Sequence, residues 1–248
     1  MSVWYCIPSA RPDGGTIQRW AEMHYSLCIF RDTSGDAEKD AWEAGKLTYA
    51  WLAAGAPRVE IVHGVYPGYA KCVNALIKRA MELDADMSFA VCAGDDTIPD
   101  LAHSPEEIAE QLIEHFGGTF SVTQFTGDRW GDDEYGRRHW PDAPAFVDRI
   151  AGSPWIGREF ARRMYGGNGP YWDGWHHNWL DEELKLVAEE LGVYWPRRDL
   201  IHYHDHPLRN PGGHRPEFHR GVDEDSRKMK PVFEARQAAG FPGSEPIP

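Results

Sequence analysis

The sequence lacks an apolar run long enough to cross a membrane, and its start, MSVWYCIPSARP, lacks the basic residues and long apolar core of a secretory signal. Cysteine is scarce: Cys6, Cys28, Cys72 and Cys92 stand singly in apolar segments and form no CxxC pair. This usage argues against a disulfide framework and against a cysteine metal site. We expect a cytoplasmic protein (in the host cytoplasm if the chain is viral) with no membrane partner and four free, buried thiols.

An excess of positive charge is also missing. The chain has 26 Lys and Arg against 39 Asp and Glu, a formal net charge of −13. Because non-specific nucleic-acid binding depends on neutralising phosphates, this balance disfavours such a function, although it leaves room for a local basic cleft. The length of 248 residues and the 42% hydrophobic content suit one large domain, placed at 1–207, followed by a tail at 208–248.

Short apolar runs alternate with helical patterns in the first hundred residues. The runs at 3–7, 27–30, 59–64 and 88–93 predict strands, and the stretches between them predict helices. This order predicts an α/β fold with a mostly parallel, Rossmann-like sheet flanked by helices, and an irregular C-terminal tail. The elements expected afterwards are strands at 120–125 and 193–195 and helices at 104–116, 157–165, 181–191 and 225–239.

The segment FAVCAGDDTIPD, residues 89–100, ends a predicted strand in two adjacent carboxylates, Asp95 and Asp96. Ligands of α/β sheets gather beyond the carboxyl ends of the strands. Two neighbouring carboxylates repel each other unless a cation or several donors stabilise them, and oxygen ligands suit Mg²⁺ or Mn²⁺. The pair therefore predicts a divalent-metal site. The alternative is a solvated acidic turn in which Asp96 caps the next segment.

Four segments together resemble the nucleotide-sugar glycosyltransferases of the GT-A fold, of the family 2 kind and similar to short phage enzymes. They are IPSARP after the first strand, GYAKCVNALIKRA before the acidic strand, AGDDTIPD at its end, and a late DEEL helix followed by HYHDHP. The resemblance spans about residues 3–207. It implies a GT-A-like sheet and a donor that is a nucleoside-diphosphate sugar, with a UDP-sugar expected.

The resemblance also implies roles for particular residues. The first loop would contact the base and ribose of the donor, and Asp95 and Asp96 would hold Mn²⁺ or Mg²⁺ against its diphosphate. The usual family motif is DxD, and here Ala93 stands where its first aspartate would fall. Lys71 and Asn74 would border the nucleotide, although the ordinary polarity of an exposed helix face explains these two residues equally well. The implied donor-binding residues are Pro8, Ser9, Ala10, Arg11, Lys71, Asn74 and Asp95.

Three acids, Asp181, Glu182 and Glu183, begin a predicted helix. In inverting members of the family, a carboxylate at the start of the corresponding helix takes the proton from the acceptor hydroxyl. A general base must reach that hydroxyl, and a helix start projecting into a cleft can present one. Acids in a first turn also stabilise any helix against its dipole. Asp181 and Glu182 are the preferred catalytic candidates.

Alternating histidines follow in LIHYHDHP: His202, His204 and His206 would point to one face of a strand. Family members supply a late histidine to the metal, and His204 or His206 matches that position. The same histidines suggest a rival, a zinc-dependent hydrolase, but the sequence lacks HExxH.

Weaker expectations concern the acceptor and a cover for the site. Trp172 and Trp175 are the aromatic side chains expected to face an acceptor, and residues 127–144 suit a loop over the site. Four tail residues could fold over the diphosphate as a lid: His214, Arg215, His219 and Arg220.

These features favour a metal-dependent glycosyltransferase that moves a sugar to an acceptor hydroxyl, on a saccharide or on a hydroxymethylated base in DNA. The alternatives are a metal-dependent hydrolase and a non-catalytic protein that binds sugar nucleotides, because a fold does not fix its chemistry.

Overall fold

The structure is a computed structural model that describes residues 1–11, 14–128, 146–205 and 218–248, without the side chains of 146–147 and 218–223. The predicted alternation of strands and helices is confirmed in its first part. The elements are β1 (Ser2–Pro8), α1 (Ile17–Glu22), β2 (Ser26–Asp32), α2 (Ala37–Ala54), β3 (Val59–Gly64), α3 (Tyr69–Leu83) and β4 (Met87–Val91).

Shorter elements make up the second part. They are β5 (Thr97–Ile98), α4 (Pro105–Phe116), β6 (Val122–Phe125), α6 (Phe146–Arg149), β7 (Pro154–Gly157), α7 (Arg158–Arg163), the 3₁₀ helix η1 (Met164–Gly167), α8 (Leu180–Glu190), β8 (Tyr194–Arg197), β9 (Tyr203–His204) and α9 (Phe218–Ala238). The predicted serine cap of α4 is confirmed, because Ser104 and Glu107 form a reciprocal capping box.

Seven strands form one mixed sheet in the order β3-β2-β1-β4-β7-β6-β8. Strand β7 runs antiparallel to its neighbours β4 and β6, and the other neighbouring pairs are parallel. The α/β class with a mostly parallel sheet is thus confirmed. Strands β5 and β9 pair separately as a two-stranded antiparallel sheet.

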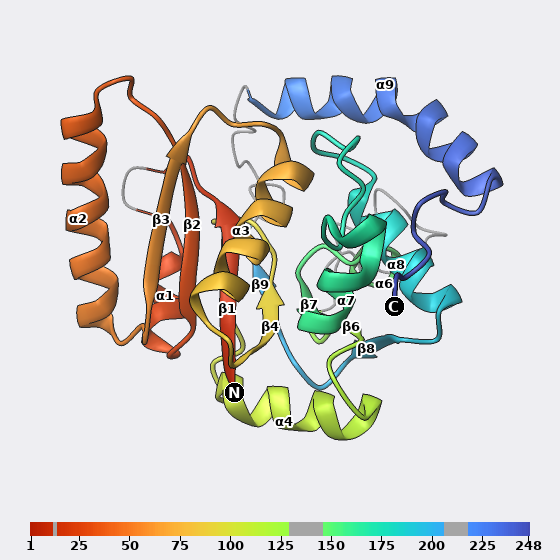
Figure 1. Ribbon diagram of the computed structural model, residues 1–248, viewed down its shortest axis with the longest axis horizontal. Helices are drawn as coiled ribbons and strands as arrows, with labels where there is room; N and C mark the ends of the chain where they lie inside the picture. Colours follow the sequence, from red (N-terminus) through yellow and green to blue (C-terminus); the bar gives the residue numbers. More distant parts are fainter. Residues whose placement is uncertain (12–13, 129–145, 206–217) are drawn as a thin grey trace.

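Helices cover both faces of the large sheet. Side chains alternate along β1, so Trp4 and Cys6 face one core and Tyr5 and Ile7 face the other. The first core is closed by α3, α7, α8 and α9, and the second by α1, α2 and α4. Figure 1 shows α2 beyond β3 at one side of the molecule and α9 running across the top. All four cysteines are free and buried, as predicted, and they share the first core.

Strand β7 was not predicted, and the helix expected at 157–165 is shorter and continues as η1. Four residues starting with Pro154 are too few to show a period, and the strand is defined by its pairing with Phe89–Val91. Its carbonyl at Pro154 also accepts the Cys92 amide at 3.1 Å, which fixes where the chain leaves β4.

The C-terminal helix α9 begins at Phe218, earlier than the predicted 225. Phe233 and Phe241 are buried in the same core as α3 and α8, so the described end of the tail packs on the main domain. The boundary at 207/208 itself lies outside the described residues and stays a prediction. Within the described chain, no helix combines the length and the apolar character that a membrane span needs.

Candidate active site

The acidic pair lies where it was predicted, just beyond the carboxyl end of β4. Hydrogen bonds from two tyrosine hydroxyls to backbone carbonyls hold the turn in place. Tyr5 donates to Gly94 at 2.6 Å, and Tyr69 donates to Ala93 at 3.0 Å. The chain before α1 packs so closely that a Cβ on Gly15 would lie 2.3 Å from the Asp95 carbonyl oxygen. The acidic turn is therefore a fixed part of the fold.

Asp95 joins this turn to the loop after β1. Its Oδ2 accepts from Ser9 Oγ at 2.7 Å, and its Oδ1 lies 3.2 Å from Arg11 Nε. The predicted donor-binding loop and the predicted metal turn are thus in direct contact. Pro8, the last residue of β1, and Ala10 flank Ser9 in that loop.

Arg31 binds the backbone of the loop after β1, a role that the sequence did not predict. It is nearly buried on β2, and its Nη1 donates to the backbone carbonyls of Ser9, at 3.0 Å, and Arg11. Its Nη2 forms an ion pair with Glu43 of α2. The available signal was an arginine directly after the apolar run LCIF, which is too common a pattern to assign a role.

Asp96 pairs with His204. The pairing of β5 with β9 sets Thr97 opposite His204, and His204 Nε2 then lies 3.1 Å from Asp96 Oδ1. Burial raises the pKa of the Asp96 carboxyl, but the hydrogen bond with His204 and the charges of His204 and Arg11 together hold that pKa below its ordinary value. Asp96 is ionised at neutral pH as a result.

Of the three histidines, His202 and His204 lie in different surroundings. His202 is buried in the second core, where its Nδ1 bonds to the Ser153 carbonyl at 3.0 Å and its Nε2 accepts from Trp155 Nε1 at 3.4 Å. Burial lowers the pKa of His202 to about 4. His202 is therefore a neutral core residue, and His206 lies outside the described residues.

Asp181, the first acid of α8, is the most unusual carboxylate of the site. Its side chain is half-buried, and no hydrogen bond or ion pair of its carboxylate is found within the described ranges. Burial, and then the charge of Glu182, raise its pKa well above the usual range. Its charge adds to the raised pKa values of Tyr69 and Cys92, which border the acidic turn, so the Asp181 carboxylate lies near the same edge of the sheet.

The two acids that follow are in different situations. Burial raises the pKa of Glu182, and the charge of Arg149 opposes that shift. Glu183 is fully buried and paired with Arg236 at 2.6 Å. Glu183 cannot reach an acceptor, which leaves Asp181 and Glu182 of the three candidates.

The two residues of α3 that were predicted to bind the donor lie in different environments. Lys71 is exposed. Asn74 is buried, and its amide donates to the Tyr171 carbonyl at 2.8 Å and to Asp173 Oδ1 at 2.7 Å while its oxygen accepts from the Tyr171 amide. These contacts explain why Asn74 is buried: its side chain holds the 169–173 segment against α3.

The two tryptophans expected to face an acceptor are engaged by the protein. Trp175 is buried and donates to Glu183 at 3.0 Å, which corrects its assignment to the acceptor. The ring of Trp172 packs against the Arg236 guanidinium at 3.9 Å. The proposed lid residues of the tail, and nearly all of 127–144, lie outside the described side chains.

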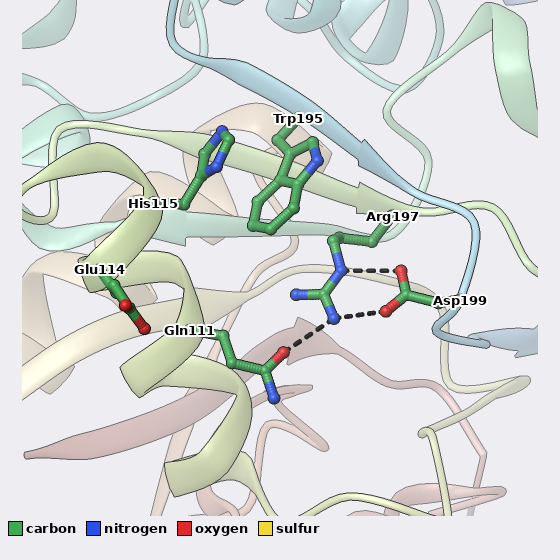
Figure 2. A pocket seen from close by; sticks show the side chains of 6 residues that line it. All are labelled: Gln111, Glu114, His115, Trp195, Arg197 and Asp199. Atoms are coloured by element: carbon green, nitrogen blue, oxygen red, sulfur yellow. Dashed lines mark hydrogen bonds and ion pairs between the residues drawn. The ribbon is translucent and has the colours of Figure 1, made fainter.

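A surface hollow opens between α4 and β8, and none of the predicted site residues lines it. Figure 2 shows the Trp195 ring between His115 and Arg197, and Arg197 bonded to Gln111 and Asp199. These contacts occupy the aromatic surface and join the helix to the strand. The hollow is best explained as a seam between two elements.

Comparisons with known proteins add little to this geometry. The chain matches no protein-family model and no curated protein sequence. Among solved structures it is similar to mouse xyloside xylosyltransferase 1 in its apo form, with 7% identity over 78% of this chain and 83% of that chain and a TM-score of 0.37. A likeness of that degree does not define an activity for this chain.

Proposed function

We propose that the chain is a glycosyltransferase that moves a sugar from a nucleoside-diphosphate sugar, with a UDP-sugar as the expected donor, to an acceptor hydroxyl. The observation that carries the proposal is the pair of carboxylates, Asp96 and Asp181, at one edge of the sheet. Asp96 is held ionised beside His204, whereas Asp181 has a raised pKa and no described partner. Carboxylates of one site whose pKa values shift in opposite directions are typical of sites with separate electrostatic and proton-transfer roles.

Asp96 and His204 fit a divalent cation such as Mn²⁺ or Mg²⁺. Within the described residues no three His, Cys, Asp or Glu side chains form a metal-binding group. A two-ligand protein site suits an ion that takes its other ligands from substrate phosphates and water, as Mg²⁺ commonly does. When bound, the ion would stabilise negative charge on the leaving diphosphate. Asp95 would contribute mainly by holding Arg11 and Ser9 against the same turn.

The loop after β1 would receive the nucleotide. Ser9 and Arg11 are fixed by Asp95 and by Arg31, so the loop is organised before a ligand arrives. The side chain of Arg11 is 47% exposed, which leaves its guanidinium able to meet a phosphate. Lys71 is exposed on the helix that starts beside the acidic turn.

Asp181 would act as the base of an inverting reaction. The acceptor oxygen forms a bond to the anomeric carbon while the bond from that carbon to the diphosphate oxygen breaks. The bonding electrons leave with the diphosphate, and the acceptor proton passes to Asp181. A carboxylate with a raised pKa is a stronger base than an ordinary one, which suits this step. Glu182 would sustain the raised pKa through its like charge.

The acceptor is a saccharide or a hydroxymethylated base in DNA. The net charge of −13 favours the first, since DNA binding requires a local basic groove. Transfer that falls steeply as salt rises would identify the DNA acceptor. The two rivals are less well supported: the sequence lacks the HExxH motif of zinc hydrolases, and a non-catalytic binder has no need for an unpaired carboxylate such as Asp181.

Release of UDP from a UDP-sugar in the presence of Mn²⁺ tests the proposal. Asp96→Asn keeps the shape of the side chain and removes its charge, so UDP release should fall by about 100-fold or more, as expected when charge stabilisation of a leaving group is lost. Asp86→Asn is the matched control, because Asp86 is exposed in the turn just before β4 and its side chain makes no described contact. Equal release by wild type and Asp96→Asn would overturn the proposal.

A further inference from the structure

A buried ion pair connects the C-terminal helix α9 to the first turn of α8. Arg236 Nε lies 2.9 Å from Glu183 Oε2, and Arg236 Nη2 lies 2.6 Å from Glu183 Oε1. The side chains are 11% and 1% exposed. Two parallel bonds between a guanidinium and a carboxylate fix distance and orientation together.

Further donors complete the carboxylate of Glu183. The Tyr165 hydroxyl donates to Oε1 at 2.7 Å, and Trp175 Nε1 donates to Oε2 at 3.0 Å. The Trp172 ring covers the Arg236 guanidinium at 3.9 Å. Each oxygen of Glu183 thus accepts two bonds, and the helix turn that carries it is anchored at a single position.

The start of α8 needs such an anchor. Its N-cap residue Trp179 has a left-handed backbone with φ of 72° and provides no side-chain cap. A non-glycine residue in that conformation is strained and persists only where its surroundings hold it. Helix α9 supplies two more contacts here: Trp179 Nε1 donates to the Ser226 carbonyl at 2.8 Å, and the Trp179 ring stacks on Phe233.

We propose that Arg236 is a positioning residue that, through Glu183, holds the first turn of α8 so that Asp181 faces the acidic edge of the sheet. Asp181 and Glu183 are two residues apart on a helix of 3.6 residues per turn, so they project to opposite sides. One side is anchored by α9 while the other presents the carboxylate. This inference rests on the proposed role of Asp181 in glycosyl transfer.

The test compares four variants with wild type: Arg236→Met, Arg236→Lys, the double variant Glu183→Gln with Arg236→Met, and Lys230→Met. The double variant leaves no unpaired buried charge and guards against loss of folding. Lys230 is an exposed cation on the same helix and serves as the matched control. We expect Arg236→Met and the double variant to lower kcat for transfer by about 10- to 100-fold with little change in donor KM, as for a displaced catalytic group. Arg236→Lys should recover part of the loss.

Amide hydrogen exchange gives a readout that does not depend on activity. Exchange at 180–184 should accelerate in Arg236→Met and in the double variant, while β1 and β4 keep their protection and Lys230→Met matches wild type. Unchanged kcat and unchanged exchange in a folded double variant would overturn the inference. Faster exchange with unchanged kcat would also overturn it, because the turn would then be anchored without serving the reaction. A wild-type protein that binds no donor would instead refute the proposed function, and the positioning role with it.

Discussion

His202 shows how one buried residue links the fold to pH. Its pKa is lowered to about 4 in the folded protein, whereas the ordinary value is near 6.5. Between these two pH values His202 is protonated in the unfolded chain and neutral in the folded protein. Stability contributed by neutral His202 is therefore complete above the ordinary value and decreases as pH falls toward 4. We expect a loss of about 2–3 kcal/mol across this window. Urea denaturation at pH 7 and pH 4.5 should show a smaller difference in a His202→Gln variant, and an undiminished difference would contradict the assignment.

A second prediction at the residue scale concerns Asp181. A base with a raised pKa loses activity as pH falls through that pKa, so the acidic limb of kcat should lie above the ordinary range of carboxyl groups. Glu182→Gln removes a like charge and should move the limb to lower pH. Asp181→Asn should lower kcat by about 10²- to 10⁴-fold. Glu190→Gln is the control, because Glu190 is an exposed acid at the end of the same helix. An acidic limb that stays at the same pH in Glu182→Gln would refute this electrostatic coupling.

At the scale of elements, Arg31 ties β2, α2 and the loop after β1 together. Arg31→Met should destabilise the protein by about 2–4 kcal/mol, because Glu43 loses a partner that is only 7% exposed. The loop should also loosen, which weakens binding of a UDP-sugar. Chemical denaturation and donor titration measure the two effects. Arg162→Met is a control, since Arg162 is exposed on α7 and the side chain of its partner Glu159 is 40% exposed; equal donor affinity in Arg31→Met and wild type would contradict the support role.

Which elements the sequence predicts depends on their length. The strands and helices up to β4 have clear apolar patterns. Ser9, Arg11 and Asp95, which the family resemblance assigns to donor binding, meet because they follow the parallel strands β1 and β4. Strands β5, β7 and β9 have two to four residues and are defined by partners far along the chain. The Glu183–Arg236 pair spans 53 positions, and the acids 181–183 look alike until their contacts separate them.

At the scale of the whole molecule, the first core keeps every described cysteine out of contact with solvent. Cys6, Cys28, Cys72 and Cys92 lie in the core between the sheet and α3, and burial raises the pKa of Cys72 to about 12. Native protein should therefore react very slowly with a thiol reagent at pH 8, while unfolding in guanidinium should expose all four thiols. Rapid native reaction of two or more thiols would contradict the packing of this core.

The proposed function requires that the acidic edge of the sheet bind a sugar nucleotide through a metal ion at Asp96. Thermal unfolding of wild type and Asp96→Asn against a panel of UDP-sugars, with Mn²⁺ or with EDTA, tests it most directly. At a donor concentration of about 100 times Kd, the expected stabilisation is about 2.7 kcal/mol, or a rise in Tm of about 5–10 °C. We expect that rise for one donor, with Mn²⁺, in wild type alone. The same rise in EDTA or in Asp96→Asn, or no rise with any donor in folded wild type, would contradict it.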